Sequence, residues 1–589
     1  MPAFSRLSFA LLLALLLFSC APEAPDLSPR QPAEEQQARH FMISAANEQA
    51  VEAGLDILRR GGNAVDAAVA VQMMLTFTEP SESGIGGGAF MMLHLPRADT
   101  TASGLNHIMM YDGRETAPSA ARPNRFQAGG LSMPLVLSVP SGKSVGVPGT
   151  VAALHKAHQA HGVLPWSELF TPAIQAAASG LPYPPMLRRR VESDYSLQFF
   201  ADTREYFVYQ ARDYVEDADG TPRAMLHNPE LAETLRRIAA EGPAAFYEGA
   251  IAEDIVENSH RRWPFGGDMQ PEDLAGYEAK MRNPVCGSYR EFTLCGAAPP
   301  SSGGITVLQI LGMLEAFDMS AYDSGSAAAA HLLAEASRLA FADRQFYIGD
   351  PDFTDVPAAE LIAPDYLRQR AALIAEDRAL HEAFPGDPRA GIPELSGQSL
   401  PPEMPSRGTS HFSILDADGM AVSMTTSIEA PFGSRLMTNG FLLNNQLTDF
   451  SFSPELNGRA HPNAVAGGKR PRSSMSPFFV MDAGGELRYI IGSRGGSRII
   501  GYVAQALIGL IDWELPMQEA VSLPNIVHRG SSLELEAGTS AEALKPALER
   551  LGHKVDITEM QSGLHGIERT EAGWRGGADP RLKGVARGQ

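Results

Sequence analysis

The sequence predicts a layered protein in which helices cover strands. Three observations support this class: helical periodicity in many segments before residue 380, strand-like segments joined by short turns beyond residue 408, and a further helical pattern near residue 500. Strands framed by helices on both sides are typical of layered α/β proteins. The chain has 589 residues, of which 44% are apolar and 20% are charged, so it can bury a large core.

The charge balance excludes one class of function. The chain has 69 acidic and 48 basic residues, which gives a net charge of −21. A nucleic-acid-binding protein presents a basic face, so we expect no nucleic-acid partner. Three cysteines in a chain of this length also exclude a scaffold built on disulfides.

The N-terminus has the features of an export signal. Residues 9–18 form an apolar run, too short to span a bilayer, and Cys20 follows at a position that resembles a bacterial lipobox. We therefore expect residues 1–19 to be a lipoprotein-type signal peptide, Cys20 to be lipidated and residues 20–40 to be a flexible tether. Ala21 favours the outer membrane, so we expect an exported, periplasmic, lipid-anchored protein of a Gram-negative bacterium. An ordinary secretory signal remains the alternative.

The first part of the chain is mainly helical by pattern. Residues 47–60 carry apolar side chains on one face and end at a Gly-Gly pair, and Asn63 can cap a second helix over residues 64–75. A glycine-rich turn at 84–88 precedes a buried strand at 89–95. Further helical patterns cover residues 150–161, 172–179, 230–240 and 327–343.

The composition changes at residues 384–408, which are rich in Pro, Gly and Ser and predict an exposed loop. Strand patterns follow it at once. Two of them, 409–415 and 421–428, flank a predicted hairpin turn. A second hairpin is predicted over 478–492 and a helix over 498–513.

The two cysteines beyond the N-terminus lie in a short strand-turn-strand pattern. Cys286 and Cys295 are symmetric about its centre at Arg290 and Glu291. An exported protein folds in an oxidising compartment, so a cross-strand disulfide between them is plausible. Two buried thiols are the alternative.

Three patterns superficially match known sites, and none fits. Residues 84–89 match GxGxxA, but a dinucleotide site needs a strand before the glycines and a helix after them. Ser144 lies in a GxSxG pattern, but a proline prevents the immediate helix that a nucleophile elbow requires. His155, His158 and His161 share a predicted helix without an HExxH acid, so we interpret them as a solvated face. The sequence therefore predicts no metal site.

A catalytic signal lies where the exposed loop meets the first strand beyond it. Gly408 and Thr409 form this junction. A threonine hydroxyl is a weak nucleophile and needs a nearby base. Cutting the Gly408–Thr409 bond would give Thr409 a free α-amine, whose pKa of roughly 8 suits it to accept the hydroxyl proton. This is the N-terminal-threonine variant of triad catalysis.

Many ordered motifs accompany this junction from about residue 40 to the C-terminus. They are residues 61–68, 83–88, 114–118, 146–149, 299–304, 342–344, 349–351, 409–411, 443–446, 469–471, 473–477, 495–497 and 579–581. In these motifs the sequence closely resembles the γ-glutamyltransferases (glutathione hydrolases), which are self-cleaving N-terminal-nucleophile hydrolases. The resemblance implies an α+β fold, a four-layer αββα sandwich, with a large subunit at 41–408 and a small subunit at 409–589.

The resemblance also implies roles for the reacting groups. Thr409 would be the nucleophile both in self-cleavage and in turnover, and Ser427 would hydrogen-bond it and tune it. Gly495 and Gly496 would form the oxyanion hole, because backbone N–H groups stabilise the negative charge that develops on the acyl oxygen. Water or an acceptor amine would resolve the acyl-enzyme.

A γ-glutamyl group carries both an α-carboxylate and an α-ammonium. The resemblance implies that Arg114, Ser473 and Ser474 bind the carboxylate, for which an arginine fork is well suited. It implies that Gln446 and Asp449 accept from the ammonium. The substrate site should therefore contain both charges.

Glu429 departs from the asparagine that many family members carry at this position. Its carboxylate could accept from an ammonium and would repel a second negative group. We expect a γ-glutamyl hydrolase/transpeptidase acting on glutathione-like small molecules, with no metal or organic cofactor and with membrane contact only through the anchor. Two alternatives remain: a related acylase cleaving a glutaryl-type amide or poly-γ-glutamate, and a non-catalytic surface lipoprotein on the same fold.

Overall fold

The computed structural model describes residues 36–96, 107–212, 214–215, 223–261, 265–389, 408–456, 458–582 and 584–589. The predicted signal peptide, Cys20 and nearly all of the tether lie outside the described residues, as does most of the predicted loop at 384–408. The chain divides into two compact units, and the smaller one contains Pro182–Leu226. The larger one contains the rest of the described chain and all the residues predicted to act in catalysis or substrate binding.

The larger unit contains two seven-stranded sheets, and every neighbouring pair of strands in them is antiparallel. The first sheet has the predicted strands around Thr409 at its centre. Its order is β25 (Val585–Gly588), β2 (Met42–Ala45), β12 (Ser410–Leu415), β13 (Ala421–Ser427), β3 (Gly88–His94), β4 (Ile108–Gly113) and β9 (Lys280–Arg282).

The second sheet contains the predicted hairpin over residues 478–492 near its centre. Its order is β1 (Gln36–Ala38), β24 (Gly573–Ala578), β23 (His565–Thr570), β19 (Leu487–Gly492), β18 (Phe478–Met481), β11 (Phe292–Gly296) and β10 (Val285–Tyr289). The two sheets meet closely where β12 faces β19, because Gly492 leaves room for the ring of His411.

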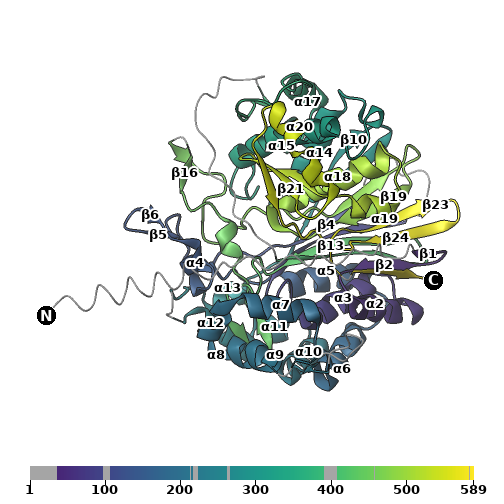
Figure 1. Ribbon diagram of the computed structural model, residues 1–589. Coiled ribbons are helices and arrows are strands. Elements are labelled where there is room, and N and C mark those ends of the chain that lie inside the picture. Colours follow the sequence, from purple (N-terminus) through teal and green to yellow (C-terminus); the bar gives the residue numbers. More distant parts are fainter. Residues whose placement is uncertain are drawn as a thin grey trace. The chain divides into compact units, whose positions relative to one another are not determined.

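Helices cover the outer face of each sheet (Figure 1). On the first sheet lie α2 (Glu48–Arg59), α3 (Ala64–Thr78) and α5 (Thr150–His161). On the second lie α14 (Gly303–Leu314) and α18 (Ile499–Ile511), and α15 (Ala327–Tyr347) packs beside α14. The larger unit is therefore a four-layer αββα sandwich, and the expected fold class is confirmed.

The predicted helices form with small shifts at their ends. Other helices with helical sequence patterns are α6 (Thr171–Ser179) and α10 (Pro229–Glu241). Asn63 caps α3 as expected: its side chain accepts from the backbone of Asp66, whose carboxylate accepts in return from the backbone of Asn63. Every residue of α3 is buried, which explains its almost continuous apolar run. Among the described residues, we find no helix with both the length and the apolar character needed to cross a membrane.

The predicted hairpin of cysteines is β10 and β11. Cys286 stands directly opposite Cys295 in the antiparallel register, and the structure joins the two by a disulfide rather than leaving two thiols. Arg290 has a φ of 52° in the turn between the strands, at the predicted centre.

Candidate active site

Thr409 immediately precedes β12, at the edge where β13 ends with Ser427. The two hydroxyl oxygens lie 3.1 Å apart, and both residues are 3% exposed. The backbone N–H of Glu429 donates to the Ser427 oxygen at 2.9 Å, which fixes the orientation of the serine. The pairing of β12 with β13 therefore brings the predicted nucleophile and its predicted partner together.

The backbone at the Gly408–Thr409 junction is strained. Thr409 has a φ of 144°, which a β-branched residue rarely adopts. A Cβ atom at position 408 would overlap the carbonyl oxygen of Glu429, so this close approach requires Gly408. The strain is located at the bond that the sequence analysis predicts to be cut.

Gly495 and Gly496 lie in the turn between β19 and α18, with φ values of 127° and 60°. The side chain of Arg494, just before them, pairs with the carboxylate of Glu82. The backbone carbonyl of Glu82 accepts from the N–H of Ile428, the residue after Ser427, at 3.2 Å. Glu82 thus links the turn that contains Gly495 and Gly496 to the end of β13, which carries Ser427.

The residues predicted to bind opposite charges of the substrate contact each other. The Arg114 guanidinium is buried, and its Nη2 donates to the Asp449 carboxylate and to the carbonyl oxygen of Arg472. Gln446 Nε2 donates to the same Asp449 oxygen at 2.8 Å. Arg114 and Asp449 therefore present one positive and one negative group side by side, as a zwitterionic head group requires.

Glu429 connects the predicted nucleophile to this charged pair. Its backbone bonds Ser427, and its carboxylate accepts from the side-chain amide of Asn445, the residue before Gln446. The side-chain oxygen of Asn445 in turn accepts from the N–H of Ala430 at 2.9 Å. The Glu429 carboxylate is thus held between the hydroxyl pair of Thr409 and Ser427 and the residues predicted to bind the head group.

Ser473 and Ser474 follow the carbonyl that Arg114 binds. The Ser473 hydroxyl oxygen accepts from the N–H of Met475 at 3.1 Å. The Ser474 oxygen accepts from Arg344 Nη2 at 2.7 Å. Because this lone pair is occupied, the Ser474 O–H can donate to a substrate carboxylate.

Arg344 is a site residue to which the sequence analysis assigned no role, although it ends the motif at 342–344. Its Nε donates to the Ser302 hydroxyl at 2.7 Å, and Ser302 donates to the carbonyl of Ser473. Burial and the nearby Arg472 lower the pKa of Arg344. Arg344 therefore positions Ser474 directly and Ser473 through Ser302. Only the three-dimensional contacts identify this role.

Glu115 was also missed, because a glutamate beside an arginine suggests an ordinary ion pair. Its side chain is fully buried, and neither carboxylate oxygen hydrogen-bonds within the described part of the chain. Arg114 Nη1 lies 3.7 Å away. Burial raises the pKa of Glu115 to about 8, so this carboxyl is largely protonated at neutral pH.

The patterns set aside in the sequence do not join this site. The Ser144 hydroxyl is buried and donates to the backbone carbonyls of Val139 and Ser141, so it is not an exposed nucleophile. The histidines of α5 are half-buried, and the interpretation as a solvated face is wrong, because each ring contacts another part of the protein. The pairs are His155 with the Trp166 ring, His158 with the Leu164 carbonyl and His161 with the Tyr111 hydroxyl.

Comparisons with known proteins agree on one family. The family model described as Gamma-glutamyltranspeptidase matches residues 50–589. A "Glutathione hydrolase proenzyme" of Bacillus subtilis (strain 168) is 35% identical over 559 residues, covering 93% of this chain and 91% of the relative. One of Escherichia coli (strain K12) is 36% identical over 595 residues, covering 98% and 97%.

A solved structure is similar over the same length. The crystal structure of cephalosporin acylase from Bacillus halodurans superposes with a TM-score of 0.80 and 26% sequence identity. The similarity covers 97% of this chain and 99% of that one. The fold similarity therefore includes the elements that carry Thr409, Arg114 and Asp449.

Proposed function

The chain belongs to the gamma-glutamyltranspeptidase family, whose activity is γ-glutamyl hydrolysis and transfer, and from that premise we propose that Thr409 is its nucleophile. The substrate would be the γ-glutamyl amide of glutathione and related compounds. The observation that carries the proposal is the buried pair of Thr409 and Ser427 hydroxyls, 3.1 Å apart, at a strained peptide bond.

The first step would be self-cleavage. Thr409 Oγ1 attacks the carbonyl carbon of Gly408, the bond from that carbon to the Thr409 nitrogen breaks, and the hydroxyl proton passes to the nitrogen. Water hydrolyses the resulting ester and releases the Gly408 carboxylate and the threonine hydroxyl. The φ of 144° favours this route, because breaking the bond relieves the strain. The products would be subunits of 41–408 and 409–589, once the predicted signal and tether are left aside.

Turnover would then use the freed α-amine of Thr409 as the general base. The amine accepts the hydroxyl proton while Oγ1 attacks the γ-carbonyl, and the leaving amine takes up a proton as the acyl-enzyme forms. The backbone N–H groups of Gly495 and Gly496 would stabilise the oxyanion. Water gives hydrolysis, and an acceptor amine gives transfer.

The head-group residues would select the γ-glutamyl moiety. The substrate carboxylate would bind Arg114, Ser473 and Ser474, while the ammonium would bind Asp449. In the free protein the partly exposed Asp449 pairs with the buried Arg114, so the arginine charge is not buried alone before the substrate arrives. Glu429 and Gln446 would add acceptors for the ammonium.

The experiment compares the wild type with Thr409→Ala. The wild type should release cysteinylglycine from glutathione, and the variant should remain uncut and inactive. Ser144→Ala provides a matched control, because it removes another buried hydroxyl that bonds only local carbonyls. A cleaved, active T409A protein would exclude Thr409 as the nucleophile.

An acylase acting on glutaryl-type amides is the second candidate, because the fold is similar to that of a cephalosporin acylase. A glutaryl group has the carboxylate but lacks the ammonium. Faster cleavage of a glutaryl amide than of the matching γ-glutamyl amide would favour this candidate. The negative charges of Asp449 and Glu429 favour the γ-glutamyl substrate.

We also propose that the protein is exported and anchored through a lipid on Cys20. The apolar run at 9–18 and the cysteine that follows it support this localisation. The wild type should fractionate with the outer membrane, and Cys20→Ser should release it into the soluble periplasmic fraction. Equal distribution of both proteins would contradict lipid anchoring.

A further inference from the structure

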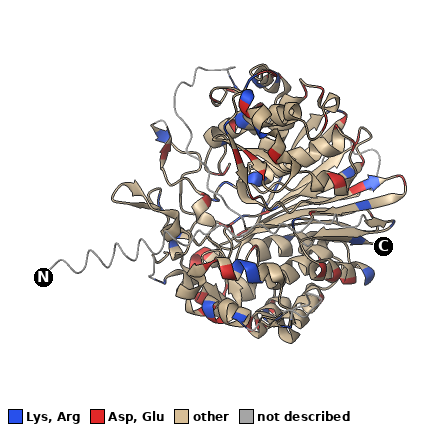
Figure 2. Cartoon of the chain, viewed as in Figure 1, with Lys and Arg blue, Asp and Glu red and all other residues tan. Residues whose placement is uncertain are grey.

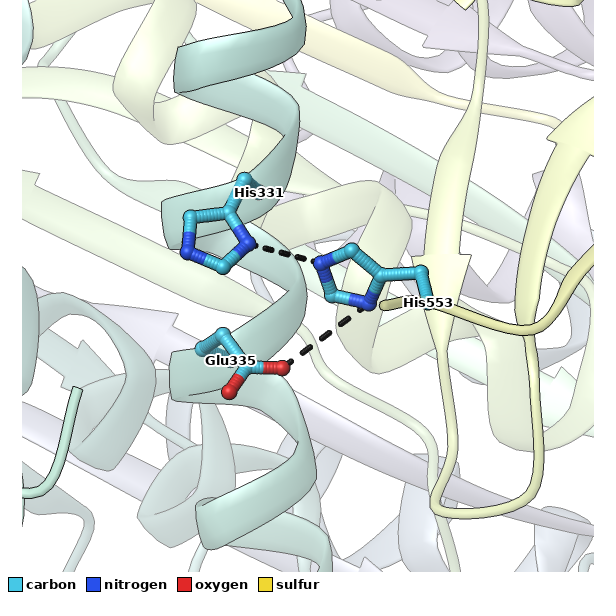
Figure 3. A group of neighbouring side chains, drawn as sticks. All are labelled: His331, Glu335 and His553. Carbon is cyan, nitrogen blue, oxygen red and sulfur yellow. Dashed lines mark hydrogen bonds and ion pairs between the residues drawn. The ribbon is translucent and has the colours of Figure 1, made fainter. Parts of the chain in front are cut away.

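A second cluster of chemically active side chains contains His331 and Glu335 of α15 and His553 from another segment (Figure 3). His331 and Glu335 are one helical turn apart on this helix. His553 comes from the loop between α20 (Lys545–Arg550) and β22 (Val555–Thr558). All three are buried, and one potential ligand atom from each lies within 4.8 Å of the others. Among the described residues, this is the one such group of three.

The hydrogen bonds assign the protons on both rings. His331 Nε2 lies 2.7 Å from the carbonyl oxygen of Ala375, so this nitrogen must carry a proton. The other nitrogen, Nδ1, therefore has a lone pair, and it lies 2.7 Å from His553 Nε2. His553 Nε2 must donate that hydrogen bond, which leaves a lone pair on His553 Nδ1.

This last lone pair faces a negative charge. His553 Nδ1 has no hydrogen-bond partner among the described residues, and Glu335 Oε1 lies 3.8 Å away. Two acceptors face each other in a buried place, which is unfavourable without a proton or a cation between them.

We propose that His331, Glu335 and His553 form a binding site for a zinc-type divalent cation. Two neutral imidazoles and one carboxylate are a ligand set that zinc uses in proteins. The surroundings also resemble the support of a metal site: the Ala375 carbonyl orients His331, and the Leu380 N–H donates to Glu335. The lone pair of His553 Nδ1 is already free, and that of His331 Nδ1 becomes available to a cation once the hydrogen bond from His553 Nε2 is broken.

The positive charge of Arg338 determines which kind of cation this site can bind. Arg338 donates to Glu335 Oε1 at 2.9 Å and opposes a positive ion there. Mg²⁺ and Ca²⁺ rely on oxygen ligands, and one shared carboxylate offers them little. Zn²⁺ and Co²⁺ bind imidazole directly, so they can tolerate this charge.

The site connects segments on either side of Thr409. α15 precedes the proposed cleavage point, and His553 follows it. Apolar residues of α15 and of the small sheet formed by β20 (Ile526–His528), β21 (Leu533–Glu536) and β22 already pack together around this contact. If the chain is cut as proposed, the cation would cross-link the two subunits; this consequence rests on the proposed function, whereas cation binding does not.

The test is calorimetric titration of untagged, metal-stripped full chain with Zn²⁺, repeated with Co²⁺, Mg²⁺ and Ca²⁺. We expect about one Zn²⁺ per chain, a visible absorption band with Co²⁺, and no binding of Mg²⁺ or Ca²⁺. Thr409→Ala should bind equally well, so failure of self-cleavage and failure of this site give different results. No Zn²⁺ binding in either protein would overturn the proposal.

Substitution of the proposed ligands tests whether Zn²⁺ binds at these residues. His553→Asn and His331→Asn should each weaken Zn²⁺ binding by more than the roughly 10- to 100-fold lost when only a supporting partner is removed. Arg338→Gln should tighten it. His107→Asn, which changes the other close histidine pair with His94, is the matched control and should bind as the wild type does. Unchanged Zn²⁺ affinity in folded H331N and H553N proteins would refute the assignment.

Discussion

Arg114 gives the most quantitative test of the substrate site. Its Nε and Nη2 donate to protein acceptors: the carbonyls of Pro471 and Arg472 and the carboxylate of Asp449. Its Nη1 makes no hydrogen bond within the described residues, and Glu115 lies 3.7 Å from it. Two N–H groups of Nη1 are therefore available for the α-carboxylate of a γ-glutamyl substrate.

Arg114→Lys keeps the positive charge and removes the planar fork. A hydrogen bond to a charged group contributes about 1.5–3 kcal/mol. Loss of one such bond should lower kcat/KM for a γ-glutamyl amide by about 10- to 150-fold, mainly through KM, because the contact exists already in the ground state.

The assay compares a chromogenic γ-glutamyl amide with the 4-aminobutyryl amide, which lacks the α-carboxylate. The R114K variant should lose activity on the first substrate and retain the low wild-type activity on the second. An equal loss on both substrates would refute the carboxylate contact and indicate a structural role for Arg114. Urea unfolding of both proteins controls for damage to the contacts with the partly exposed Asp449 and the buried Glu115.

Three other changes test separate parts of the account. Ser427→Ala removes one hydrogen bond to Thr409 and should lower kcat by up to about tenfold at unchanged KM in single-turnover kinetics; an unaltered rate would exclude the tuning role. Gly408→Ala places a Cβ against the Glu429 carbonyl and should slow self-cleavage on a time-resolved gel, whereas normal processing would show that the close approach is unimportant. The pKa of Glu115 is about 8 in the folded protein, above the unfolded value of 4.5. Between these two pH values the folded state holds a proton that the unfolded state has lost. The free energy of unfolding should therefore fall by about 1.4 kcal/mol for each pH unit as the pH rises through this range. Glu115→Gln should flatten this slope in urea unfolding between pH 5 and 8, and an identical slope in the variant would contradict the buried neutral carboxyl.

Local signals predicted several of the helices and strands, including the hairpin of β12 and β13, but not others such as α14 and β23. The α3 helix shows both the success and the limit of such reasoning. Asn63 marks its start correctly, but it extends to Thr78, beyond the expected end at residue 75. Thr76 and Thr78 donate their hydroxyls to carbonyls one turn earlier, so polar residues continue the helix instead of ending it.

The site could be predicted only in part. The Gly408–Thr409 junction has a local chemical rationale, but the partners of Thr409 followed from family resemblance. Arg114 and Asp449 are 335 residues apart, so no local pattern could indicate that they pair. The same limit applies to His331 and His553, because metal-site spacing rules consider neighbouring positions in the chain.

The roles of Glu115 and Arg344 depend on burial and on contacts. A glutamate beside an arginine is common on surfaces, and the sequence does not reveal that Glu115 is enclosed without hydrogen bonds in the described structure. Arg344 acts through Ser302 and Ser474, which are brought to it by the packing of separate elements. Only the fold reveals such indirect support.

The most direct test of the central claim is the intact mass and N-terminal sequence of the purified wild type and the Thr409→Ala variant. We predict two chains from the wild type, the smaller one beginning Thr-Ser-His-Phe, and one uncut chain from the variant. A wild-type chain that hydrolyses glutathione while remaining uncut, or a variant that is cut at Gly408, would contradict the N-terminal nucleophile.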